Sequence, residues 1–403
     1  MDHDELLWRE EAVDRVLDLR ETMLADHATE SVGLDAVGDR VLAESITAET
    51  DAPPVSRATM DGFAVNAADE YPLTVREGEV FPEDDPGEID RGETQRIATG
   101  APLPRGADAV LKREEATVAD GELTGASVEA GTYVYEQGRN YGAGETLFAA
   151  GERLGPRDAI LLGDMGLDSV SVRARFSVGV VATGTEIHEG RSRDLDSPML
   201  AGLIESWGHT AAFEGSAPDE YERVRDLLAE TASEYDVVVS TGGTSVGHKD
   251  HVIRALDELG DVLFHKVRIR PGKPIAVADL PDHDAVAVAI PGKPIGAHVV
   301  AAFVMAPLFT GMDGPYPTVT AACSTDVGLG PEGFEYVIPV TLDAGVAQPL
   351  GHADSPLSVY SDTFDPSVLS SSTRTTRADG VVCTTDPLTE GETVSVIPYD
   401  VLE

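Results

Sequence analysis

From residue 177 onwards, the chain repeats one pattern: a short run of Val, Ala and Ile, a loop that contains glycine, and a helical stretch. We predict buried strands at residues 177–184, 236–243, 275–280 and 285–292, with another near 210–214. Helices are expected at about 199–207, 219–235, 251–259 and after Pro294. Uninterrupted apolar strands that alternate with helices are typical of a parallel sheet covered on both faces. The pattern therefore predicts a doubly wound, mostly parallel α/β domain over residues 177–314.

The segments on either side of this domain follow other patterns. Residues 46–141 contain short β-like runs separated by Gly, Pro and acidic turns, which predicts a small β-rich domain. Residues 315–403 lose the helical signal and carry alternating strands such as TVTAAC, which predicts a small β-barrel or sandwich. A helix is expected over about residues 4–28, because Leu and Val recur there at helical spacing.

The net charge restricts the partners. The sequence has 72 acidic and 29 basic side chains, a formal net charge of −43, and 42% hydrophobic residues. This apolar content is that of a folded protein, so the charge lies on a compact surface that disfavours nucleic acid and anionic membranes. The longest apolar run, residues 295–309, is interrupted by Gly296, His298 and Pro307 and is too short to span a bilayer. We expect a cytoplasmic protein.

The acid excess also predicts a dependence of stability on salt. It resembles adaptation to a salt-rich cytoplasm, because added ions screen the repulsion between surface carboxylates. We expect the melting temperature to rise as KCl is added, which differential scanning calorimetry would measure. A melting temperature that did not rise with salt would contradict this expectation.

Basic side chains are concentrated in one part of this acidic chain. Residues 249–293 hold seven basic and seven acidic side chains, and residues 262–278 hold four basic side chains and no acid. Cations close to phosphate or oxyanion oxygens form charge-assisted hydrogen bonds, so an anionic ligand is one explanation. The other is a set of local ion pairs with Asp250, Asp257 or Asp279. The candidate ligand-binding cations are Lys266, Arg270, Lys273 and Lys293.

Three glycine loops follow three of the predicted strands: TGTE at residues 183–186, TGGTSVG at 241–247 and PGKP at 291–294. Ligands of open α/β sheets bind at the carboxyl ends of strands, and glycine loops beside helix N-termini hold phosphate. A phosphorylated ligand is therefore predicted. A Walker loop and a GxGxxG fingerprint are both missing from this region, which argues against an NTPase motor and a nicotinamide oxidoreductase. The candidate substrate-binding loop residues are Thr183, Gly184, Gly242, Gly243, Ser245, Gly247 and Gly292.

Carboxylates also stand at loop positions, as Glu186, Asp219 and Asp250. Carboxylates beside phosphate repel it unless a cation bridges them, and Mg²⁺ bound by one or two carboxylates and phosphate oxygens does so. We therefore predict Mg²⁺, with Glu186 and Asp250 as its ligands. Asp219 and Asp250 could instead cap the helices that follow them. With no HExxH or other His-rich cluster in the sequence, zinc is not expected.

Two motifs resemble signatures of a known family. ATMDGFAV at residues 58–65 and RIATGAPLP at residues 96–104 are similar to two signatures of the molybdopterin molybdenumtransferases, the MoeA/gephyrin family. The segments ATGTE, VVVSTGGTSVGHKD and RIRPGKP follow in the family order. The resemblance covers nearly the whole chain. It implies an elongated linker domain (1–45 and 142–176), the β-rich domain (46–141), a molybdopterin-binding α/β domain (177–314) and a C-terminal β-barrel (315–403).

The resemblance also implies an activity. Members of the family insert molybdate into adenylylated molybdopterin with Mg²⁺ present, hydrolyse the adenylyl link and release AMP and molybdenum cofactor. They work as homodimers whose sites lie between the α/β domain of one subunit and the other domains of its partner, and a molybdopterin adenylyltransferase is a candidate partner. The resemblance assigns catalytic roles to Asp61, Thr99, Glu186 and Asp250. It assigns substrate binding to Asp219, Lys266, Arg270 and Ser371.

The chain departs from the family pattern at three places. Lys293 stands where many members have Asn, Asp-Ser-Pro at residues 196–198 replaces Asp-Ser/Thr-Asn, and the spacing after the serine-rich turn at 369–372 is altered. These departures leave open tungstate in place of molybdate, or a non-catalytic pterin-binding scaffold. The carboxylates Glu186, Asp219 and Asp250 favour the enzyme over the scaffold, because a protein that only binds phosphate gains nothing from them. The MDG and TGAP motifs disfavour a molybdopterin adenylyltransferase, which shares only the α/β domain.

Overall fold

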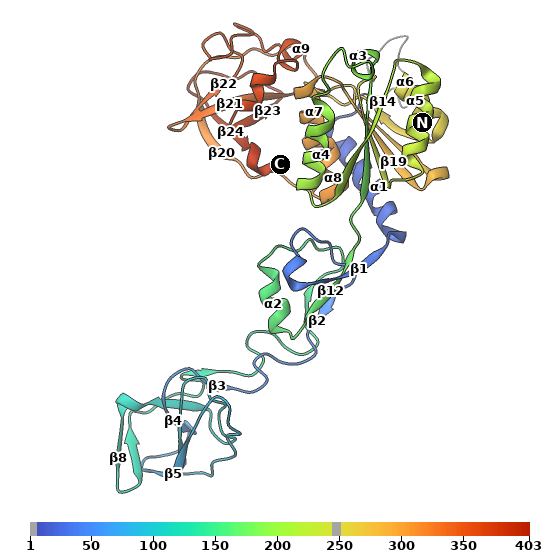
Figure 1. The fold of residues 1–403 in the computed structure, drawn as a ribbon. Helices are drawn as coiled ribbons and strands as arrows, with labels where there is room; N and C mark the ends of the chain where they lie inside the picture. The colour runs from blue at the N-terminus through green and yellow to red at the C-terminus, as the bar shows by residue number, and fades with distance from the viewer. Residues whose placement is uncertain (1–5, 244–250) are drawn as a thin grey trace. The chain divides into compact units, whose positions relative to one another are not determined.

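The computed structural model describes residues 6–243 and 251–403 (Figure 1). The chain divides into two compact units. Unit 1 takes in the chain up to Ala28 together with Arg173–Glu403, and unit 2 is Thr29–Val172. No helix of the described residues is both long and apolar enough to cross a bilayer.

Unit 1 contains a six-stranded sheet with the strand order β14-β13-β15-β19-β18-β16. Its strands are β13 (Ser177–Thr183), β14 (Thr210–Ala217), β15 (Val237–Thr241), β16 (Asp261–His265), β18 (Ala276–Leu280) and β19 (Ala285–Ile290). Strands β14, β13, β15 and β19 run parallel, and every residue of β15 and β19 is buried. The predicted doubly wound, mostly parallel sheet is confirmed.

One edge of this sheet is antiparallel. β18 pairs antiparallel with β19, and β16, a strand that we did not predict, pairs antiparallel with β18. Only residues 281–284 separate β18 from β19, which is too short for the crossover that parallel strands need. The turn contains Asp284 in the left-handed region, with φ of 53°.

Helices cover both faces of the sheet and bury a separate apolar cluster on each (Figure 1). Val237 and Val239 of β15 join one cluster and Val238 the other, because side chains alternate along a strand. The first cluster includes α1 (Arg9–Asp26), α4 (Asp196–Ser206), α7 (Pro294–Val300), a π-helical stretch at Ala301–Met305 and α8 (Ala306–Thr310). The second includes α5 (Tyr221–Ala232) and α6 (His251–Leu259). Thus α1 lies in unit 1, whereas we grouped its residues with the linker segments.

The C-terminal part of unit 1 is a closed five-stranded barrel. Its strands are β20 (Val319–Cys323), β21 (Glu335–Asp343), β22 (Val346–Pro349), β23 (Gly380–Thr384) and β24 (Thr393–Pro398). They pair in the order β21-β22-β20-β24-β23, and β23 pairs back to β21. This closure selects the barrel over the sandwich. The short strand β17 (Ile269–Arg270) pairs with β21, so the middle of the basic segment lies against the barrel.

Unit 2 is β-rich over residues 57–125, in agreement with the prediction for that segment. Its six-stranded sheet has the order β7-β4-β6-β5-β9-β8. These strands are β4 (Gly62–Val65), β5 (Leu73–Val80), β6 (Glu93–Ile97), β7 (Ala109–Lys112), β8 (Ala116–Ala119) and β9 (Glu122–Gly125), and a ribbon pairs β3 (Arg57–Ala58) with β10 (Val134–Tyr135).

The rest of unit 2 has a core of its own, which includes Leu42, Phe148 and Leu162. Its elements are β1 (Thr29–Gly33), β2 (Ile46–Thr47), β11 (Thr146–Phe148), α2 (Asp158–Asp164) and β12 (Ser169–Arg173). Here β1 pairs with β12 and β2 with β11, so segments from both ends of unit 2 build this part together. The four-part division of the sequence is finer than the two units and stays a prediction.

Candidate functional site

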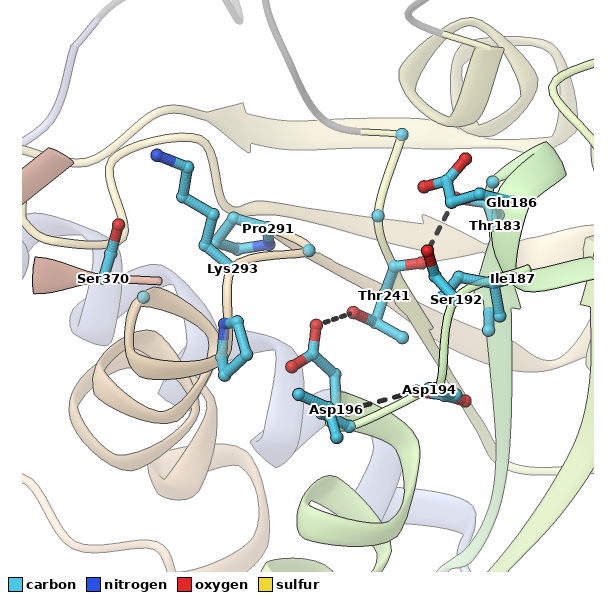
Figure 2. Close-up of a pocket in the computed structure, with 18 of the residues that line it drawn as sticks. Thr183, Glu186, Ile187, Ser192, Asp194, Asp196, Thr241, Pro291, Lys293 and Ser370 are labelled. Atoms are coloured by element: carbon cyan, nitrogen blue, oxygen red, sulfur yellow. Dashed lines mark hydrogen bonds between the residues drawn. The ribbon is translucent and has the colours of Figure 1, made fainter. Parts of the chain in front are cut away.

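A pocket of about 520 Å³ lies at the carboxyl ends of β13, β15 and β19 (Figure 2). Ligands of doubly wound sheets bind at this end of the strands. All three predicted glycine loops contribute to its wall. Its lining includes Thr183, Gly184 and Glu186 after β13, Thr241, Gly242 and Gly243 at the end of β15, and Pro291, Gly292 and Lys293 after β19. The lining also includes the segment 192–196, Gly272, Pro274, Asp219 and Ser370.

Glycine is required where these loops meet. Gly242 has a φ of 86°, and a Cβ there would come 2.6 Å from the carbonyl oxygen of Thr183. A Cβ on Gly292 would lie 3.1 Å from the Cα of Gly242. The backbones of the three loops therefore approach one another closely, which leaves their main-chain groups rather than side chains to form much of the wall.

Glu186 stands on the short helix α3 (Thr185–His188), directly after the first glycine loop. Its side chain is exposed and lines the pocket, and no hydrogen bond from a described residue reaches its carboxylate. Its main-chain carbonyl accepts a 2.9 Å hydrogen bond from the Ser192 N–H, which ties α3 to the next loop (Figure 2). The backbone at Glu186 is thus anchored, and the carboxylate itself remains open to a ligand.

Asp219 belongs to the same pocket, and the helix-cap alternative for it is wrong. Helix α5 begins at Tyr221, with Glu220 at the N-cap position. Asp219 Oδ2 instead accepts hydrogen bonds from the Thr185 main-chain N–H and from Thr185 Oγ1, both at 3.3 Å. The Asp219 N–H donates to Thr185 Oγ1 at 3.0 Å. These bonds join the loop after β14 to the loop after β13 and bring Asp219 beside Glu186.

A further carboxylate in the pocket, Asp196, was missed by sequence reasoning. Its residue is only 6% exposed, its Oδ2 accepts a 3.0 Å hydrogen bond from Thr241 Oγ1, and its Oδ1 has no partner in the described part of the protein. Burial raises the pKa of Asp196, and the nearby Asp194 adds to the rise. A buried carboxyl with an unsatisfied oxygen in a pocket is a mark of a functional site. The sequence signal was the Asp-Ser-Pro tripeptide, which drew attention to Pro198 rather than to the aspartate.

Replacing Asp196 with asparagine is expected to raise the free energy of unfolding at neutral pH, because the wild-type protein has to ionise a buried carboxyl there and the amide carries no charge. The pKa of Asp196 is higher in the folded protein than in the unfolded chain. At a pH below the pKa of the unfolded chain, Asp196 is protonated in both states and costs no stability. The free energy of unfolding of the wild type then falls as the pH rises through the folded-state pKa. Urea unfolding of the wild type and Asp196→Asn, from acidic to neutral pH, measures the difference. A difference that does not grow with pH would contradict the assignment.

The predicted cations do not all lie in the pocket. Lys293 lines it, and its Nζ donates a 2.8 Å hydrogen bond to the carbonyl of Ser367. The Ile295 N–H donates to the carbonyl of Ser370 at 3.1 Å, so the start of α7, directly after the third glycine loop, is bonded to the serine-rich turn of the barrel. In that turn Ser370 lines the pocket, rather than the predicted Ser371.

Lys266, Arg270 and Lys273 lie outside the pocket lining, although Gly272 and Pro274 on either side of Lys273 belong to it. Within the described ranges, neither Arg270 nor Lys273 has a carboxylate at ion-pair distance. Burial and the charge of Asp261 raise the pKa of Asp279, which a neighbouring cation would instead lower. The ion-pair alternative with Asp279 therefore has no support at these two cations.

Asp61 and Thr99 lie together in unit 2. Asp61 precedes β4 and Thr99 follows β6, and these strands pair antiparallel with Gly62 opposite Ile97. Asp61 Oδ1 accepts hydrogen bonds from Thr99 Oγ1 and from the Thr99 main-chain N–H, both at 2.7 Å. These bonds lower the pKa of Asp61, which is exposed and keeps its other oxygen open. Gly62 is required, because a Cβ there would lie 2.1 Å from the carbonyl oxygen of Leu111.

Three predicted residues, Ser245, Gly247 and Asp250, lie outside the described residues, so the helix-cap alternative for Asp250 stays open. Within the described ranges, no group of three or more His, Cys, Asp or Glu side chains could hold a metal ion.

Comparison with known proteins agrees with this architecture. Residues 179–310 match the family described as a probable molybdopterin binding domain, and residues 8–166 match the MoeA N-terminal region (domain I and II). The molybdopterin molybdenumtransferase of Synechococcus elongatus is 31% identical over 301 residues, which are 70% of this chain and 75% of that protein. That of Bacillus subtilis is 32% identical over 297 residues, 67% of each chain.

Among solved structures, the molybdopterin biosynthesis MoeA protein from Pyrococcus horikosii matches with a TM-score of 0.74 and 28% identity, covering 98% of this chain and 99% of that chain. The fold and the pocket thus define an enzyme of molybdenum cofactor biosynthesis with a molybdopterin-binding domain. The chain belongs to the molybdopterin molybdenumtransferase family and is a transferase.

Proposed function

We propose that this transferase inserts molybdate into adenylylated molybdopterin, with hydrolysis of the adenylyl link and release of AMP. The observation that carries the proposal is the strand-end pocket, in which glycine backbones meet the carboxylates of Glu186 and Asp219. A site that bound only phosphate would gain nothing from acidic side chains at its rim. A site that holds Mg²⁺ beside a phosphate uses both kinds of group.

The glycine loops are proposed to bind the phosphate groups of the pterin nucleotide. Main-chain N–H groups beside the helix that begins at Pro294 suit an anion. Lys293 adds a positive charge there, and its bond to Ser367 fixes the direction of its side chain. Because family members often carry asparagine at this position, we expect the phosphate contact in this chain to be more sensitive to salt.

The residues of the pocket fit a bound Mg²⁺. Mg²⁺ is commonly held by one or two carboxylates together with substrate phosphates, and this mode needs no preformed cluster of three protein ligands. We propose Glu186 and Asp250 as its ligands, and Asp219 lies in the same pocket as Glu186. The support is the Glu186 carboxylate, which has no hydrogen-bond partner in the described ranges. When bound, Mg²⁺ supplies positive charge next to the adenylyl phosphate.

Asp61 and Thr99 are proposed to complete the site from the other subunit of a homodimer. The two bonds from Thr99 keep Asp61 ionised and orient it, so its second oxygen would accept a hydrogen bond from the attacking water or from a protonated molybdate oxygen.

We further propose that the protein works in a salt-rich cytoplasm. There, a molybdopterin adenylyltransferase would supply the pterin nucleotide.

The first experiment mixes the purified protein, at high salt with Mg²⁺, with adenylylated molybdopterin and molybdate, and follows AMP by chromatography. Molybdate-dependent AMP release is the expected result. AMP release with tungstate and not with molybdate would show that the protein inserts tungsten instead of molybdenum. Tight binding of the pterin nucleotide without AMP release, with both oxyanions failing, would overturn the proposal in favour of a binding or scaffold protein.

A further inference from the structure

Two cations of the basic segment share one aromatic ring. The guanidinium carbon of Arg270 lies 4.2 Å from the centroid of the Phe334 ring, and Lys273 Nζ lies 5.8 Å from the same centroid. Both distances are within the range of cation–π attraction. Arg270 belongs to β17 and Phe334 precedes β21 of the barrel, so the pairing of these strands brings the ring to the cations.

The loop that carries Phe334 is fixed on both sides of the ring. Arg268 donates from Nη1 to the carbonyl of Gly333 at 3.2 Å, and the Glu335 N–H donates to the carbonyl of Arg268 at 2.8 Å. Tyr336 donates from its hydroxyl to the carbonyl of Pro331 at 2.7 Å. Phe334 itself is buried in the barrel core. The position of the ring is therefore set by hydrogen bonds to the backbone and by the barrel core, and not by Arg270 or Lys273.

The carboxylate next to this ring is already engaged. Glu335 accepts two hydrogen bonds from Arg9, at 2.6 Å from Nε and 3.0 Å from Nη2. Throughout the described ranges, no carboxylate pairs with Arg270 or Lys273, and Arg270 Nε is buried without a hydrogen-bond partner. An aromatic face orients a cation without neutralising it, whereas a carboxylate would compete with an incoming anion. The two cations are thus held with their charges available.

We propose that Phe334 is a positioning residue that holds Arg270 and Lys273 as an oxyanion-binding pair. The inference rests on the proposed function for the identity of the oxyanion: free molybdate, or a phosphate of the pterin nucleotide. Gly272 and Pro274 line the pocket, so the segment that carries the pair borders it. Phe334 is buried in the barrel core and is not expected to contact the substrate. It acts by restricting the side chains that do, so less ordering is needed when the anion binds.

Calorimetric titration with molybdate, and separately with AMP, of the full-length wild type and three variants tests this role. Phe334→Leu removes the aromatic face and keeps an apolar side chain, and Phe334→Tyr keeps the face. Phe364→Leu is the matched control, because Phe364 is buried in the same core cluster and has no cation on its ring among the described residues. All titrations are made at one fixed chloride concentration, with thermal unfolding measured for each variant.

Phe334→Leu is expected to weaken the binding of one of the two probes by about five- to tenfold. Phe334→Tyr and Phe364→Leu should bind that probe like the wild type. A loss confined to molybdate identifies the free oxyanion, and a loss confined to AMP identifies the nucleotide phosphate. In turnover, the KM should rise for molybdate if molybdate is the affected probe, or for adenylylated molybdopterin if AMP is the affected probe, while kcat stays constant.

The inference is overturned if Phe334→Leu binds both probes like the wild type, or if Phe364→Leu loses as much affinity. Wild-type protein that binds neither probe overturns it as well. Its failure is distinguishable from that of the proposed function. If oxyanion binding depends on Phe334 but no AMP is released, the positioning role stands and the proposed molybdate insertion is refuted.

Discussion

Replacing Asp61 with asparagine is expected to lower molybdate-dependent AMP release by at least about tenfold, as loss of a positioned acid or base usually does. Asparagine keeps an oxygen that accepts the two hydrogen bonds from Thr99, so the local fold should survive. It loses the negative charge and the second carboxylate oxygen. Because the Thr99 bonds lower the pKa of Asp61, the wild-type carboxylate stays ionised in mildly acidic buffer. Activity should therefore not fall there through protonation of Asp61.

A matched control for this variant lies in the same unit. Asp51 also accepts two hydrogen bonds, from the Ala143 N–H at 2.8 Å and from Gln137 Nε2 at 2.7 Å, and these bonds lower its pKa as well. Asp51→Asn removes the same charge outside the MDG motif and also costs one hydrogen bond, because the two donors reach different oxygens of Asp51. Initial rates of AMP release and unfolding temperatures are compared for the two variants. Near-normal turnover in Asp61→Asn, or an equal loss in Asp51→Asn, would remove Asp61 from the site.

The strand-end pocket could be predicted because local patterns carry most of it. Apolar runs identify β13, β15 and β19, and each run ends in a glycine loop at the edge where parallel strands place their carboxyl ends. The same reasoning misjudged Asp219. An aspartate just before a helix is an ordinary cap, and only the contact with Thr185, 34 residues away along the chain, shows that it has another role.

Other parts of the site depend on pairings that local sequence does not contain. Phe334 reaches Arg270 because β17 pairs with β21, between segments that the sequence assigned to different domains. Asp196 lies in the pocket because α4 begins at that residue, three positions before the helix predicted from the apolar spacing. Asp61 and Thr99 were linked by the family resemblance alone, and the pairing of β4 with β6 supplies the physical reason.

Replacing Glu186 with glutamine is also expected to lower AMP release by at least about tenfold, because a neutral amide neither balances nor holds a divalent cation as a carboxylate does. The exposed side chain makes no described hydrogen bond that glutamine would break, so unfolding should be unchanged. Near-normal turnover in this variant would remove Glu186 from the site.

The decisive test combines this variant with Asp61→Asn, since the proposed site takes Glu186 from one subunit and Asp61 from its partner.

Co-expression of Asp61→Asn and Glu186→Gln chains with different affinity tags should restore activity to about one quarter of the wild type in the unselected mixture, because half of randomly assembled two-fold dimers are mixed and each of these has one intact site. Mixed dimers purified through both tags should reach about half of the wild-type activity by the same symmetry. The matched control is Asp61→Asn with Thr99→Val. These residues contact each other within unit 2, so no mixed dimer contains an intact site. If every site used Asp61 and Glu186 of one chain, the first mixture would stay as inactive as the control, and the shared site would be ruled out.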